Sequence, residues 1–108
     1  MIFVDTGFLV ALAQPTDDLH KRARAWASHI GESLLLTQYV QVEVINHLSR
    51  VADRPRAHLI TSHILSNPRY DLLYVSEEGF RAGLQLHQER KDKDWSLTDC
   101  ISFHVMGQ

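Results

Sequence analysis

The most informative absences in this sequence are those of cysteine pairs and of long apolar runs. Its 108 residues include a single cysteine, Cys100, which can form neither an internal disulfide nor a thiolate-rich zinc site. No apolar run approaches the roughly 20 residues that a membrane helix needs. Asp5 also stands where a signal peptide would carry positive charge. These absences predict a cytoplasmic protein with no membrane partner.

Several well-known functional motifs are missing as well. The sequence contains no GxGxxG and no P-loop pattern, which argues against dinucleotide and P-loop nucleotide sites. It has no GxSxG of a serine hydrolase, and its seven histidines form no HExxH zinc motif. The segment Asp5-Thr6-Gly7 lacks a second aspartate two positions on, unlike a haloacid-dehalogenase-type phosphatase. The common hydrolase and nucleotide-binding classes are therefore disfavoured.

Acidic and basic residues are present in similar numbers, 13 and 11. The formal net charge is −2, which excludes a globally basic nucleic-acid binder but not a local basic patch. An RNA partner would have to meet local cations such as Arg50, Arg54 and Arg56, or be bound through metal. The 44% hydrophobic and 22% charged fractions are typical of a folded protein, so we expect one domain over residues 1–108.

The pattern of apolar residues predicts an α/β fold. Short apolar runs predict strands at residues 2–4, 34–37 and 72–75, and helical spacing predicts helices at residues 8–13, 19–30, 40–51, 57–65, 77–90 and 100–106. A charged loop is expected at residues 91–94, and residues 96–99 fit a capping box. Strands that alternate with helices favour parallel crossovers and a central sheet flanked by helices.

Two acidic residues lie where such a fold could use them. Asp5 follows the first strand, and ligand crevices in open α/β sheets lie beyond the carboxyl ends of the strands. The alternative is an aspartate that only caps the next helix, although Thr6 is also a natural N-cap. Glu43 lies among valines and isoleucine, where an ionised carboxylate needs a compensating charge or metal. Its alternative is a local partnership with His47, four residues on.

Further polar residues are weaker candidates. Asp99 is at the third position of its expected helix, where a carboxylate favours the helix dipole whether or not it is catalytic. Asn46, one turn beyond Glu43, and Asp94, in the charged loop, could play supporting roles, although Asp94 also fits a solvated turn. Carboxylates gathered from separate elements would repel one another, and a divalent cation with oxygen ligands is the usual reason for such a cluster. Mg²⁺ or Mn²⁺ would then serve phosphodiester hydrolysis.

Three segments resemble the consecutive motif regions of PIN-domain toxins of the VapC type, which belong to type II toxin-antitoxin systems. They are IFVDTGFLVAL, TQYVQVEVINHL and, most specifically, DKDWSLTDCISFHVM. The resemblance covers essentially the whole chain. It implies a PIN-like three-layer fold, Mg²⁺- or Mn²⁺-dependent endoribonuclease activity on RNA, neutralisation by a cognate antitoxin, and a homodimer.

The resemblance also assigns residues. Asp5 matches the first acid of the family, Glu43 the second and Asp99 the third, and all three would be catalytic metal ligands. Thr6 matches the hydroxyl residue beside the first acid. The fourth acid of the family lies in a later segment with a final strand, so the resemblance implies a C-terminally truncated chain whose last strand segment is missing. A catalytically silent PIN-like module that binds protein or RNA is the alternative function.

Overall fold

The computed structural model describes residues 1–107, and the chain divides into two compact units, residues 1–72 and 73–108. The first unit is built on a three-stranded sheet in the order β1 (Ile2–Phe3), β2 (Leu34–Thr37) and β3 (Tyr70–Leu73). β1 and β2 are parallel, with Ile2 opposite Leu34 and Phe3 opposite Leu35. The backbone N–H of Leu34 donates to the carbonyl of Arg69 just before β3. A parallel pair requires a crossover connection, which the first two helices provide.

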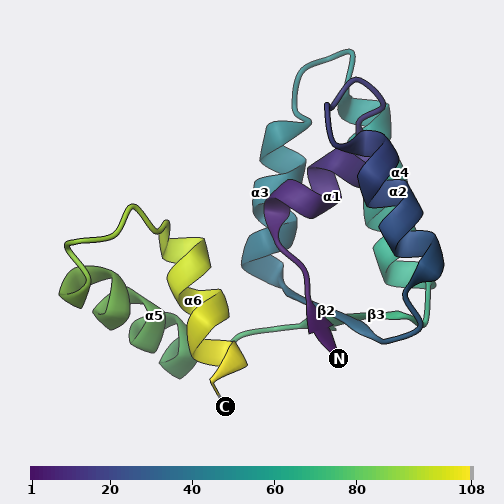
Figure 1. The fold of residues 1–108 in the computed structure, drawn as a ribbon. Coiled ribbons are helices and arrows are strands. Elements are labelled where there is room, and N and C mark those ends of the chain that lie inside the picture. The colour runs from purple at the N-terminus through teal and green to yellow at the C-terminus, as the bar shows by residue number, and fades with distance from the viewer. Residues whose placement is uncertain (108) are drawn as a thin grey trace. The chain divides into compact units, whose positions relative to one another are not determined.

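Four helices belong to this first unit: α1 (Thr6–Ala13), α2 (His20–His29), α3 (Gln38–His47) and α4 (Arg54–Ser66). Figure 1 shows them gathered on one side of the strands. α3 buries Val40 and Val44, and Leu48 follows at the next turn of the same face. The core cluster also takes Val4, Leu9, Leu34, Leu36, Ala57, Ile60, Ile64 and Tyr70. Strands and helices therefore share one core.

The second unit contains α5 (Glu77–Glu89) and α6 (Leu97–Met106), which pack on each other. The contact depends on Gly83, because a Cβ there would lie 2.4 Å from Cγ1 and 2.9 Å from Cα of Ile101. Ser76 caps α5 by accepting a hydrogen bond from the backbone N–H of Gly79. Within the described residues, no helix is long and apolar enough to cross a membrane.

The structure corrects several of the expected boundaries. α1 begins at Thr6 rather than at residue 8, and α6 begins at Leu97 rather than at residue 100. α3 ends at His47, so Val51 is not part of its apolar face and is 87% exposed in the following turn. α4 begins at Arg54 rather than at residue 57, because Pro55 suits the first turn of a helix, where its missing N–H costs nothing. The third strand is Tyr70–Leu73 rather than residues 72–75, with Tyr70 buried in the core.

Candidate active site

The candidate site begins at the carboxyl edge of the parallel strands. Continuing the register of Ile2 with Leu34 places Asp5 opposite Thr37. These two residues are the N-caps of α1 and α3, so both helices begin at the same edge of the sheet. Helix N-termini carry partial positive charge, which makes this edge favourable for acidic side chains and for phosphate.

Asp5 is the N-cap of α1, and its Oδ1 accepts a hydrogen bond of 2.8 Å from the backbone N–H of Phe8. Asp5 and Thr6 were both possible N-caps; the structure confirms Asp5 as the cap, and Thr6 is the first helical residue. Asp5 can act as the cap because its backbone is extended, which lets its carboxylate accept a hydrogen bond from the N–H of the third helical residue. The cap occupies one carboxylate oxygen of this exposed residue, so capping and metal binding by Asp5 are compatible.

Thr6 has a different partner. Its hydroxyl donates a 2.7 Å hydrogen bond to Oε1 of Glu43, which is 37 residues away in the sequence. This partly buried bond joins α1 to α3 and brings Glu43 to the residue beside Asp5. Glu43 thus bonds to another helix, and no ion pair joins it to His47 within residues 1–107.

The charge of these two carboxylates is not balanced by protein cations. Neither Asp5 nor Glu43 forms an ion pair with a lysine, arginine or histidine among the described residues. Carboxylate oxygens are the ligands that Mg²⁺ and Mn²⁺ prefer, and Mg²⁺ is commonly held by one or two carboxylates together with water and substrate phosphate. Asp5 and Glu43 fit such an ion, although no group of three His, Cys, Asp or Glu forms a ready metal site within residues 1–72.

Asp99 is held by a capping box at the start of α6. Its Oδ2 accepts from the backbone N–H of Ser96 at 3.0 Å, and its own N–H donates to Oγ of Ser96 at 3.0 Å. The expected capping box is therefore confirmed. The convergence of Asp99 with Asp5 and Glu43 on one metal stays a prediction.

The two supporting candidates are exposed. Asn46 lies on α3 one turn beyond Glu43, and Asp94 lies in the loop between α5 and α6.

In the loop between α5 and α6, Arg90 donates to both oxygens of Asp92, at 3.0 and 3.1 Å, which raises the pKa of Arg90 and lowers the pKa of Asp92. Arg90 and Lys93 also lie over the ring of Trp95. The roles of Asn46 and Asp94 in metal or substrate binding stay predictions.

Cys100 is not a candidate nucleophile. It is buried in α6 beside Asp99, and burial, followed by the negative charge of Asp99, raises the pKa of its thiol. The reactive form of cysteine is the thiolate, which both effects disfavour. Both effects therefore argue against a nucleophilic role for Cys100.

Sequence reasoning missed a groove of about 560 Å³ beside Asp5, between α1 and α2. Phe8 lines it from α1, and Arg22 and Trp26 line it from α2. One signal was available in the sequence: Arg22 and Trp26 are four residues apart and so share a helix face. The groove adds a cation and an aromatic ring to the surroundings of the first acid.

The PIN domain family model matches residues 2–108. The chain belongs to the PIN domain family. A solved structure supports the same fold: the chain resembles VapC20 of Mycobacterium tuberculosis, a toxin that cleaves the sarcin-ricin loop, with a TM-score of 0.90. The two are 22% identical, over 99% of this chain and 82% of the VapC20 chain. No curated protein matches the sequence.

These comparisons confirm the expected α/β class and the PIN-like fold with its parallel strands. The PIN family model extends over both compact units, so residues 73–108 are as much part of the match as the unit that carries Asp5 and Glu43.

Proposed function

We propose that this PIN domain is a metal-dependent endoribonuclease and the toxin of a toxin-antitoxin pair. In this proposal Asp5, Glu43 and Asp99 hold Mg²⁺ or Mn²⁺ and RNA is the substrate. The observation that carries it is the hydrogen bond from Thr6 to Glu43, which joins a second carboxylate to the residue that follows Asp5. Membership of the PIN family and the likeness to VapC20 support it.

The residues of the chain would act chiefly by holding oxygen atoms in place. The N–H of Phe8 fixes one oxygen of Asp5, and the hydroxyl of Thr6 fixes one oxygen of Glu43. The bound metal would neutralise phosphate charge and supply hydroxide from water. Ligands that are already oriented lose less entropy when metal and RNA bind, which favours catalysis.

The partner proteins follow from the same proposal. A cognate antitoxin and a second copy of the chain are the proposed partners, and the cytoplasm is the proposed location. Their support is the likeness to VapC20, which is a toxin.

The decisive test is Asp5→Asn. Asparagine caps helices about as well as aspartate, so the protein should stay folded and lose at most about 0.3–1 kcal/mol with the charge near the helix N-terminus, while the carboxylate proposed to bind metal is lost. We expect Mn²⁺-dependent cleavage of end-labelled single-stranded and hairpin RNAs to fall by at least about 100-fold, since loss of outer-shell partners alone costs about 10- to 100-fold. Asp18→Asn is the matched control, because Asp18 is an exposed turn residue outside the site.

Two results would contradict the proposal. Undiminished cleavage by Asp5→Asn would remove Asp5 from the mechanism. A wild-type chain that neither binds Mn²⁺ in calorimetry nor cleaves any RNA would instead identify the catalytically silent binding module.

A further inference from the structure

The groove beside Asp5 has a size suited to part of a substrate. Its volume of about 560 Å³ lies within the roughly 300–1,000 Å³ that is usual for small-ligand sites. Asp5 and Phe8 line it from the start of α1, and Leu19, Arg22 and Trp26 line it from the α2 side. All of these residues belong to the first compact unit. A ligand in this groove would therefore touch the residue that is proposed to bind metal.

The groove contains an aromatic ring that is both exposed and held in place. Trp26 is 38% exposed, although its ring meets that of Phe8 edge to face at 5.0 Å between centroids and 78° between planes. Phe8 itself is half-buried and packs against the core. A partly exposed indole fixed in this way is suited to stacking, and nucleobases stack on such rings with little dependence on their sequence.

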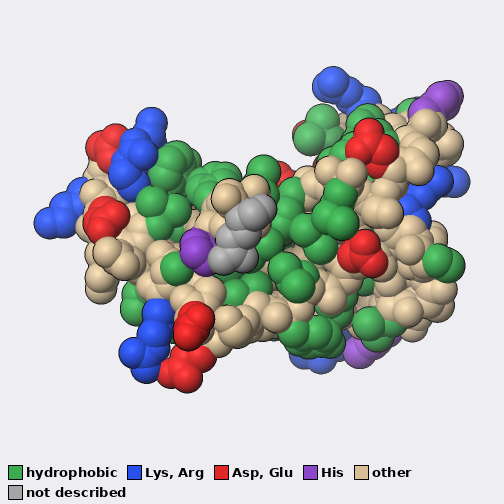
Figure 2. Space-filling model, turned by 90° about the horizontal axis from the view of Figure 1, so that it is seen from below, with side chains coloured by type: hydrophobic (Ala, Val, Ile, Leu, Met, Phe, Trp, Pro, Cys, Tyr) green, Lys and Arg blue, Asp and Glu red, His purple; other side chains and the backbone are tan. Residues whose placement is uncertain are grey.

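The helix that carries Trp26 is also cationic. α2 contains Lys21, Arg22 and Arg24 and no acidic residue. None of these three cations is ion-paired within residues 1–107, whereas Arg56, Arg81 and Arg90 each have an acidic partner. Figure 2 shows both positively and negatively charged side chains on the face in view. Of these three cations only Arg22 lines the groove, and an unpaired cation there favours a polyanion such as RNA.

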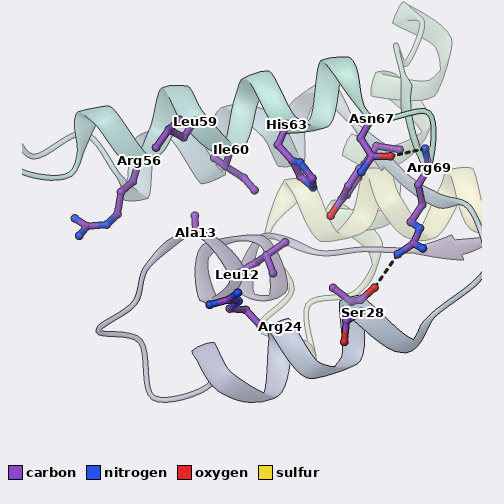
Figure 3. Close-up of a pocket in the computed structure, with 12 residues that line it drawn as sticks. Leu12, Ala13, Arg24, Ser28, Arg56, Leu59, Ile60, His63, Asn67 and Arg69 are labelled. Atoms are coloured by element: carbon purple, nitrogen blue, oxygen red, sulfur yellow. Dashed lines mark hydrogen bonds between the residues drawn. The ribbon is translucent and has the colours of Figure 1, made fainter.

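Arg22 and Arg24 line different cavities. Arg22 lines the groove beside Asp5, four residues from Trp26 and so on the same helix face. Arg24 lines a second cavity of about 490 Å³ with Arg56, His63 and Arg69, which Figure 3 shows between α1, α2 and α4. Two cations of one type on one helix thus provide a test residue and a matched control.

We propose that the groove between α1 and α2 is a nucleotide subsite, in which one base of a single-stranded RNA stacks on Trp26 while Arg22 binds the adjoining phosphate. The proposal rests on the proposed ribonuclease function and deepens it, because it names residues that position the strand next to Asp5. Stacking without edge recognition makes this subsite tolerant of base identity.

Tryptophan fluorescence tests the subsite without any cleavage. The chain has two tryptophans, Trp26 and Trp95, so Trp95→Phe leaves only Trp26 as a reporter and Trp26→Phe leaves only Trp95. Each variant is titrated with a short single-stranded RNA in EDTA at low salt. We expect saturable quenching of Trp26 and none of Trp95. Quenching of Trp95 alone, or of neither, would overturn the proposal.

Substitutions then separate stacking from general charge. Trp26→Leu should weaken RNA binding between about fivefold and about 150-fold, which corresponds to about 1 to 3 kcal/mol, whereas Trp26→Phe should retain most of the affinity. Arg22→Ala should reduce the dependence of log affinity on log salt by about 0.7, the contribution of one phosphate on a single strand. It should also weaken the quenching of Trp26. Arg24→Ala should leave that quenching unchanged, and equal effects of the two arginines would contradict the subsite.

Failure of this inference can be told apart from failure of the ribonuclease proposal. Metal-dependent cleavage with no quenching of Trp26 would overturn the subsite alone. Quenching of Trp26 by RNA with no cleavage in Mn²⁺ would support the subsite and overturn the ribonuclease. Circular dichroism melting of each variant establishes that it is folded at the assay temperature.

Discussion

The two compact units hold their candidate acids by different kinds of contact. In residues 1–72, Glu43 accepts a hydrogen bond from Thr6, which is 37 residues away and on another helix. In residues 73–108, Asp99 exchanges two hydrogen bonds with Ser96, three residues away in the same cap. A helix end needs a cap such as the one formed by Ser96 and Asp99, because its first N–H groups lack partners. Nothing in the local structure of α1 or α3 needs the bond between Thr6 and Glu43.

This difference shows which contact is stronger support for a functional site. The capping box explains the position of the Asp99 side chain whether or not it binds metal. The bond between Thr6 and Glu43 instead holds a partly buried carboxylate from another helix at the residue that follows Asp5. A long-range contact that neither helix end requires indicates function more clearly than a local cap does.

Of the substitutions that test this comparison between Glu43 and Asp99, Glu43→Gln is expected to have the largest effect on RNA cleavage. The amide oxygen can still accept from Thr6, so the fold should be preserved while the negative charge is lost. We expect Mn²⁺-dependent RNA cleavage to fall by at least about 100-fold, since loss of outer-shell partners alone costs about 10- to 100-fold. Cleavage rates over a Mn²⁺ series would measure this.

A surface glutamate supplies the control. Glu32 is exposed and pairs with the N-terminal ammonium group at the surface, so Glu32→Gln should leave cleavage unchanged and cost at most about 1 kcal/mol of stability. If Glu43→Gln cleaved RNA as fast as Glu32→Gln, the bond from Thr6 would be structural only, and the contrast between the two units would lose its functional meaning.

A smaller effect, with two distinct readouts, is expected in the second unit. Asp99→Asn keeps an oxygen that can accept from the N–H of Ser96, so it should cost only about 0.3–1 kcal/mol through the lost charge near the helix N-terminus. Ser96→Ala removes the cap hydroxyl and should cost about 1 kcal/mol. If Asp99 is a metal ligand, Asp99→Asn should lose cleavage by at least about tenfold while Ser96→Ala keeps it.

The two variants distinguish metal binding from capping, because the less stable variant should be the more active one. Urea unfolding should rank Ser96→Ala as the less stable, and RNA cleavage should rank Asp99→Asn as the less active. Loss of activity that merely followed the loss of stability in both variants would mean that Asp99 is a capping residue and no more.

Much of the fold could be predicted because its signals are local. The capping box at Ser96 and Asp99, the buried strand Leu34–Thr37 and the α/β alternation all follow from neighbouring residues. The errors arose where tertiary packing decides. Val51 continues the spacing of Val40 and Val44, but the helix ends at His47, and only the three-dimensional core determines which valines are buried.

The candidate site could be predicted only in part. The sequence indicated Asp5 and Glu43 as candidates, but their connection through Thr6 spans 37 residues and becomes visible only when β1 and β2 pair. Whether Asp5 or Thr6 would cap α1 could not be decided from residue type, because both are good N-caps. The groove with Trp26 was missed for a similar reason, since it needs α1 and α2 to be packed together.

The smallest of these effects is expected from Thr6→Val, which replaces a hydroxyl by a methyl group of similar volume. The partly buried Oε1 of Glu43 would lose its donor, so stability should fall by about 1 kcal/mol. If Thr6 positions Glu43 for metal, cleavage at low Mn²⁺ should fall about tenfold, the lower end of the range for outer-shell partners. Saturating Mn²⁺ should restore most of the rate, because the ligand itself is intact. Thr6→Ser, which keeps the hydroxyl, should behave like the wild type. A Thr6→Val variant with an unchanged Mn²⁺ dependence would show that this hydrogen bond serves only to join α1 and α3, which would make the two units alike in holding their acids for stability alone.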